Sequence, residues 1–132
     1  MIKFNTENRF AVLERDIYCV SVGTQTNCGG IAAIVGRMQL CNGPIRCSLD
    51  SQGYLSSDCE KFGDEIPIKY QSAVFDGVKR MFSERNISEG FSFFLVGLLI
   101  HAVDSNIQMN QIAGRYFVKS WLGLNPVLTK TS

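Results

Sequence analysis

A run of apolar residues from Phe91 to Ile100 constrains the fold of this chain most. A strand that is covered on both faces is apolar at nearly every position, whereas a half-exposed strand alternates apolar and polar residues. Gly90, directly before the run, is typical of a break between elements. The run therefore predicts a central β-strand with protein packed on both faces of its sheet. It is too short to span a bilayer.

Short apolar stretches separated by turn-forming residues predict four further strands earlier in the chain. They are Phe10 to Leu13, Ile17 to Val22, Gly30 to Leu40 and Ile45 to Leu49. The sequence Asn42-Gly43-Pro44 predicts the turn between the last two strands. The segment from Asp50 to Asp64, which contains three serines and two glycines, predicts a polar connection to a first helix.

Pro67 predicts the start of this first helix, because proline at the first helical position loses no needed N–H donor. The apolar residues that follow recur at helical spacing and predict one buried face. They are Tyr70, Ala73, Val74, Val78, Met81 and Phe82. Asn86 predicts a left-handed residue at the end of the helix.

A second helix is predicted to begin at Ser105, which forms a capping-box pattern with Gln108. Its predicted buried stripe comprises Met109, Ile112, Ala113, Tyr116 and Phe117. Gly123 predicts the end of the helix. Pro126 to Thr129 could form a short edge strand, where the missing proline N–H does little harm.

Composition predicts one globular domain that spans residues 1–132. The chain is 45% apolar and 19% charged, and 13 basic against 12 acidic residues give a net charge of +1. Such a balance provides no global field that would attract nucleic acid or an anionic membrane. The first residues contain no apolar export signal, so we expect a cytoplasmic protein without a membrane partner.

The five cysteines are expected to be reduced thiols that hold no metal. Cys19, Cys28, Cys41, Cys47 and Cys59 are an odd number, and none of them has C-x-x-C spacing. This pattern favours neither a disulfide framework nor a zinc site. His101 is the only histidine, which excludes metal sites built from several histidines.

The order of these elements and several residues resemble domain IV of bacterial elongation factor G over roughly residues 28 to 128. The matching residues are Ile66-Pro67, Tyr70, Ala73-Val74, Gly77, Gly90, Val103-Asp104-Ser105, Ala113-Gly114, Phe117 and Pro126-Val127-Leu128. Cys28-Gly29-Gly30 stands where the family carries a glycine-rich loop. The resemblance implies an α+β fold similar to ribosomal protein S5 domain 2. In this fold a four- to five-stranded sheet carries two helices on one face and contains a left-handed β-α-β crossover.

The resemblance also implies binding through two loops at the tip of the domain, which in the family enter the ribosomal decoding region. Carried over to this chain, the candidate binding residues are Asn27, Gly29, Gly30, His101, Asp104 and Ser105. Both loops are several residues shorter here than in the family. The family's GTPase domain is absent and no P-loop motif occurs, so we expect neither GTP hydrolysis nor a nucleotide cofactor.

Each tip residue also has a simpler interpretation. His101 can be a surface or capping histidine, and Asp104 and Ser105 precede a helix, where such residues cap the first turn. Gly29-Gly30 fits a tight turn better than a phosphate cradle, because no helix clearly follows it. Cys28 with His101 would be the only nucleophilic pair, but no pattern brings the two together. We therefore expect a protein that is not an enzyme and binds no cofactor.

Basic residues on the two predicted helices form a second candidate surface. They are Lys69, Lys79, Arg80, Arg85, Arg115 and Lys119. A shared helix face would let them contact phosphates, whereas Asp76, Glu84 and Glu89 would dilute the charge and leave an ordinary solvated surface.

Two functions follow as hypotheses. The first is a non-catalytic relative of a translation factor that binds the ribosome, structured RNA or a translation-associated partner. The second is a protein-binding inhibitor, such as an immunity protein that neutralises a toxin, in which the ribosomal loops were cut back.

Overall fold

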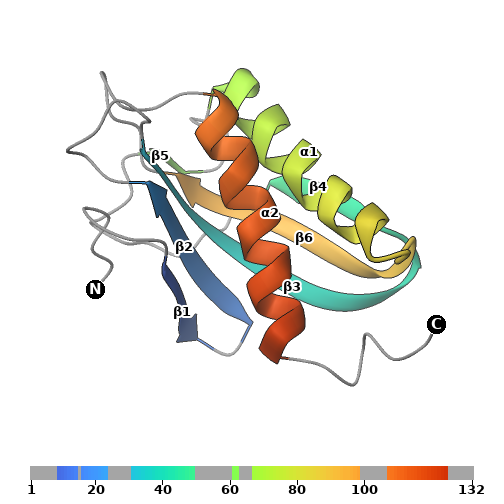
Figure 1. Ribbon diagram of the computed structural model, residues 1–132. Helices are drawn as coiled ribbons and strands as arrows, with labels where there is room; N and C mark the ends of the chain where they lie inside the picture. Colours follow the sequence, from blue (N-terminus) through green and yellow to red (C-terminus); the bar gives the residue numbers. More distant parts are fainter. Residues whose placement is uncertain are drawn as a thin grey trace.

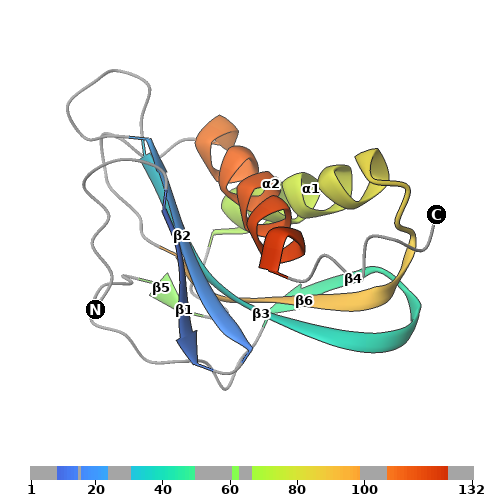
Figure 2. The same cartoon turned by 60° about the horizontal axis from the view of Figure 1, so that its bottom comes forward.

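One mixed β-sheet carries both helices on the same face (Figures 1 and 2). The computed structural model describes residues 9–14, 16–23, 31–49, 61–62, 67–98 and 107–124. The elements are β1 (Arg9–Glu14), β2 (Ile17–Gly23), β3 (Ile31–Pro44), β4 (Arg46–Leu49), β5 (Lys61–Phe62), α1 (Ile68–Glu84), β6 (Glu89–Leu98) and α2 (Ile107–Leu124). The predicted α+β class, with a sheet covered by two helices on one face, is confirmed.

The apolar run forms β6, which lies in the interior of the sheet as predicted. The strand order is β1-β2-β3-β6-β4, and the two residues of β5 pair with β6 beyond the end of β4. β6 is antiparallel to β3 and parallel to β4. Since only Ile45 separates β3 from β4, β6 is inserted between two strands that are adjacent in the sequence.

β4, α1 and β6 form a β-α-β unit whose two strands are parallel neighbours, with β5 in the connection. In Figure 1 the helices lie in front of the sheet, β4 and β6 run toward the left, and β6 lies below β4. A crossover with this arrangement is left-handed, whereas nearly all β-α-β connections are right-handed. This is the handedness that the resemblance implies.

The main core lies between the sheet and the helices and is rich in aromatic rings. Phe93 and Phe117 are fully buried, and their rings meet edge to face with centroids 5.0 Å apart. Gly36 on β3 makes room for them, because a Cβ atom there would lie 2.6 Å from the Phe93 ring. A smaller cluster lies on the other face of the sheet. It comprises Ile17, Cys19, Val35 and Val96, with Leu13 packed against it.

The two helices approach each other closely through a pair of glycines. A Cβ atom on Gly77 would lie 2.1 Å from the carbonyl oxygen of Gln111, and one on Gly114 would lie 2.3 Å from that of Val74. Both obstacles are backbone atoms of the facing helix. The absence of side chains at these two positions therefore sets the distance between α1 and α2.

The prediction for α1 is confirmed in its buried face, since all six predicted apolar residues are buried. Pro67 occupies the N-cap, so the helix begins one residue later than expected. Asn86 has φ 60°, as predicted for the residue that ends this helix.

The stripe predicted for α2 is wrong in part. Ala113 and Phe117 are buried, but Ile112 is 37% exposed and Met109 and Tyr116 are half-buried. The observed stripe contains Asn110, Ala113, Gly114, Phe117, Val118, Trp121 and Leu122. Val118, Trp121 and Leu122 are apolar and continue the helical spacing, so the predicted stripe stopped too early. Asn110 and Gly114 carry no apolar signal, and Gly114 is buried by contact with α1. The helix also continues past Gly123 to Leu124.

Two predictions about connections need correction. β3 runs through Asn42 and Gly43 to Pro44, because Gly43 adopts φ 109° and the strand bends there while Pro44 still pairs with Glu89. The segment from Asp50 to Asp64 contains β5, whose two residues are held by pairing with Gly97 and Leu98. The possible edge strand from Pro126 to Thr129 and the helix start at Ser105 lie outside the described residues.

Candidate functional site

Three strand ends border the two predicted tip loops, and all three lie at the same end of the sheet, which we call the tip end. β2 and β6 end there, and β3 begins there. Gly23, the last residue of β2, pairs with Ile31, the first residue of β3. Leu98, the last residue of β6, pairs with Ile34, three residues further along β3. Both predicted loops therefore leave the sheet at neighbouring strands. Figure 1 shows that α1 and α2 also begin near this end.

The predicted tip residues themselves lie outside the described residues. They are Asn27, Gly29, Gly30, His101, Asp104 and Ser105. Cys28, the candidate nucleophile, is also outside the described ranges. Their roles stay predictions, and only the strand ends that carry them are defined.

The six basic residues of the helices do not form one continuous patch. Lys69 lies in the first turn of α1, near the tip end, and its Nζ is 5.0 Å from the centre of the Tyr70 ring. Arg85 caps the other end of the same helix, about 24 Å away at the rise of an α-helix. Lys119 is exposed on α2. A single phosphate-binding face would need these cations closer together.

Acidic side chains neutralise two of the six cations. Arg115 on α2 binds Glu84 on α1 through two hydrogen bonds of 2.6 and 3.0 Å. This contact, together with the Arg115 charge, lowers the pKa of Glu84. Arg80 Nε lies 2.9 Å from Asp76 Oδ2, and the Asp76 carboxylate also accepts a hydrogen bond from Gln111. The predicted reduction of positive charge on the basic surface therefore occurs through these two ion pairs.

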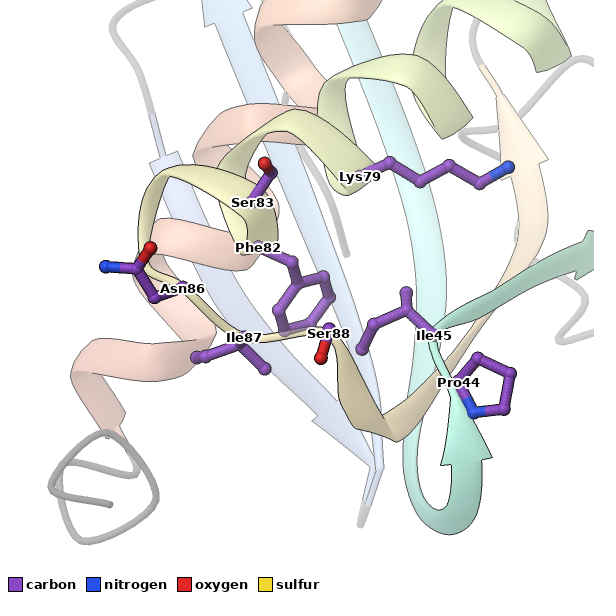
Figure 3. Close-up of a pocket in the computed structure, with 8 residues that line it drawn as sticks. All are labelled: Pro44, Ile45, Lys79, Phe82, Ser83, Asn86, Ile87 and Ser88. Atoms are coloured by element: carbon purple, nitrogen blue, oxygen red, sulfur yellow. The ribbon is translucent and has the colours of Figure 1, made fainter. Parts of the chain in front are cut away.

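A cleft of about 650 Å³ lies at the end of α1, opposite the tip end (Figure 3). It is lined by Pro44, Ile45, Lys79, Phe82, Ser83, Asn86, Ile87 and Ser88. Asn86 and Pro44 were identified in the sequence only as turn signals. The cleft exists because β3 and β6 pair up to Pro44 and Glu89, which brings the two turns together.

Lys79 is the only cation that lines this cleft, and it forms no ion pair with the residues that the structure describes. The positive charge of Lys79 also influences the half-buried thiol of Cys47 on β4. Burial raises the pKa of Cys47 to about 11, and the positive charge of Lys79 partly opposes this rise. Cys47 is therefore a neutral thiol at physiological pH and a poor nucleophile.

We expect Cys47 to react slowly with iodoacetamide at pH 8, about 100-fold more slowly than an exposed thiol of ordinary pKa, because two pKa units separate their thiolate fractions. Pulse labelling followed by mass spectrometry of the Cys47 peptide measures this rate. Lys79→Met should slow the reaction further, since it removes the charge that favours the thiolate. Labelling of Cys47 at the rate of the unfolded chain would contradict the expectation.

The raised pKa has a consequence for stability. Between the ordinary thiol pKa of 9.0 and about 11, the unfolded chain loses the Cys47 proton while the folded chain keeps it. The contribution of this thiol is therefore complete below pH 9 and is lost as the pH rises through the folded value.

The described residues contain three free cysteines, Cys19, Cys41 and Cys47. Within the same ranges, no group of three or more His, Cys, Asp or Glu side chains could hold a metal ion. Neither α1 nor α2 is long and apolar enough to cross a membrane. No protein-family model matches this chain, and a search of curated proteins finds no match.

Proposed function

We propose that this protein is a non-catalytic binding domain related to domain IV of elongation factor G, and that it binds the ribosome, structured RNA or a translation-associated partner through its tip end. The observation that carries this proposal is the shared end of β2, β3 and β6, from which both predicted loops leave. Loops on neighbouring strands can contact one partner together, and a rigid sheet positions them.

Two further features support the relationship to the translation factor. The β4-α1-β6 crossover is left-handed (Figure 1), which is rare and is expected for this family. Gly77 and Gly114, which belong to the matched residues, are the positions where α1 and α2 touch. A shared fold alone does not define a function, so the tip end has to be tested directly.

The second candidate is a protein-binding inhibitor, and the charge distribution favours it. RNA affinity depends on cations that neutralise phosphates. Here Arg80 and Arg115 are already paired with carboxylates, and Lys69 and Arg85 lie at opposite ends of α1. A partner made of protein needs no such concentration of positive charge.

We expect the wild-type protein to sediment with ribosomes at about 50 mM salt and to be largely lost at about 200 mM, since about two phosphate contacts would weaken about tenfold over this range. His101→Ala should reduce the low-salt binding if the tip carries it. Gly123→Ala, at the other end of α2 with open space around the added carbon, serves as the matched control and should bind as the wild type does.

The outcome separates the two candidates. Recovery of a single protein from lysate, together with no ribosome binding at low salt, would refute the ribosomal proposal and favour the inhibitor. Stoichiometric binding that resists salt and collapses in His101→Ala would show that the tip works as in the translation factor, despite its shortened loops.

A further inference from the structure

The cleft at the end of α1 is a second candidate binding site, separate from the tip end. One wall comes from the last turns of α1 and the turn that follows it, and the other from Pro44 at the end of β3 and from Ile45 (Figure 3). Because α1 begins near the tip end and the cleft lies at its other end, an occupant of the cleft would not compete with a partner at the tip (Figure 1).

The backbone around the cleft is held in place by hydrogen bonds. Ile45 N–H donates to the Ser88 carbonyl at 3.1 Å and links the two chain segments that line the cleft. Ile87 N–H donates to the Phe82 carbonyl at 2.9 Å and fixes the turn after α1. A site that is already formed loses less entropy when it binds a ligand.

The lining combines an apolar surface with hydrogen-bonding groups. Pro44, Ile45 and Ile87 are the apolar lining residues that remain accessible, whereas Phe82 is only 1% exposed and belongs to the core behind them (Figure 3). Ser83 and Ser88 are exposed and supply hydroxyl groups at the rim. Recognition sites of this kind hold an apolar group in the centre and orient it by a few polar contacts.

The charge of the cleft is set by Lys79. Its ammonium group forms no ion pair with the described residues, in contrast to Arg80 and Arg115. The carbonyls of Met81, Phe82 and Ser83 in the last turn of α1 already accept hydrogen bonds from the N–H groups of residues 85–87. The other charged residues on the bordering segments are Arg46, Arg80, Glu84, Arg85 and Glu89, all exposed, and of these Arg80 and Glu84 are held in ion pairs.

We propose that this cleft docks a short segment of a protein partner in which an apolar residue stands next to an acidic one. The apolar side chain packs against Pro44, Ile45 and Ile87, and the neighbouring carboxylate pairs with Lys79. A nucleic acid fits less well, because a single lining cation and apolar walls offer little to a chain of phosphates.

The test uses two peptides of nearly identical shape, N-acetyl-Leu-Asp-amide and N-acetyl-Leu-Asn-amide, added to the ¹⁵N-labelled full chain. We expect saturable shifts in the amide signals of Ile45, Ser83, Ile87 and Ser88. The Asp peptide should bind about threefold more tightly than the Asn peptide, which is the size of effect that one exposed ion pair gives. Lys79→Met keeps the apolar stem and should abolish this difference.

Lys119→Met is the matched control, since it removes an exposed lysine outside the cleft and should keep the preference for the Asp peptide. An unchanged spectrum away from the cleft shows that each variant is folded. The absence of saturable shifts at the cleft would overturn the proposal, as would a preference for Asp that persists in Lys79→Met. Equal shifts of the same amides by inorganic phosphate would identify a general anion site and would also overturn it.

Discussion

Replacing Gly77 by alanine is expected to destabilise the protein by about 3 kcal/mol, because the new methyl group would collide with the facing helix. The added Cβ would lie 2.1 Å from the carbonyl oxygen of Gln111, which is a backbone atom and cannot rotate away. The two helices would have to move apart, and the core beneath them would loosen. The higher helix propensity of alanine returns only about 1 kcal/mol.

Urea unfolding followed by circular dichroism measures the loss as a lower midpoint. Gly114→Ala should behave in the same way, since its Cβ would lie 2.3 Å from the carbonyl oxygen of Val74. Gly123→Ala is the matched control. It lies in α2 with nothing within 4 Å of the added carbon, so alanine there should leave the stability unchanged or raise it by up to about 1 kcal/mol. Equal stability of all three variants would contradict the close packing of the helices.

The second large effect is expected for Phe93→Ala, which should cost about 3 to 5 kcal/mol through lost burial and a cavity. Phe93 is 0% exposed, and its ring meets those of Phe75 and Phe117 edge to face at 6.3 and 5.0 Å. Leu98, also 0% exposed, should cost about 2 to 5 kcal/mol when it is replaced by alanine.

Phe94→Ala provides the comparison within the same strand. Phe94 is only half-buried, although it belongs to the apolar run that predicts burial on both faces. Its loss should cost clearly less than that of Phe93, as measured by the same urea titration. A larger cost for Phe94 would mean that the two faces of β6 are assigned the wrong way round.

Much of the fold follows from sequence periodicity. The apolar run predicts the interior position of β6, and the helical spacing after Pro67 predicts every buried apolar residue on α1. β5 could not be predicted, because its two residues stand in a polar segment and are fixed by pairing with β6. On α2 only Gly114 was missed for a similar reason, since it is buried through contact with α1, whereas Val118, Trp121 and Leu122 are apolar and follow from helical spacing.

The sequence predicted less about the candidate sites than about the fold. The tip residues come from the resemblance alone and lie outside the described residues. The cleft depends on the pairing of β3 with β6, which brings Pro44 next to Glu89, and no local pattern contains that register. Lys79 was identified as one of six helix cations, but only the structure separates it from Arg80 and Arg115, which have carboxylate partners.

Because β6 lies between β3 and β4 in the sheet but follows both in the sequence, the sheet cannot form in the order in which its strands are synthesised. β3 and β4 leave the ribosome before β6, and both lack β6 as a pairing partner until residue 98 has emerged. Nascent chains would therefore display strand edges that can pair with other chains. A chain truncated before Glu89 cannot complete this sheet, since the strand that joins β3 to β4 is missing. Such dependence on contacts between distant residues also predicts slow folding compared with a helical protein of this size.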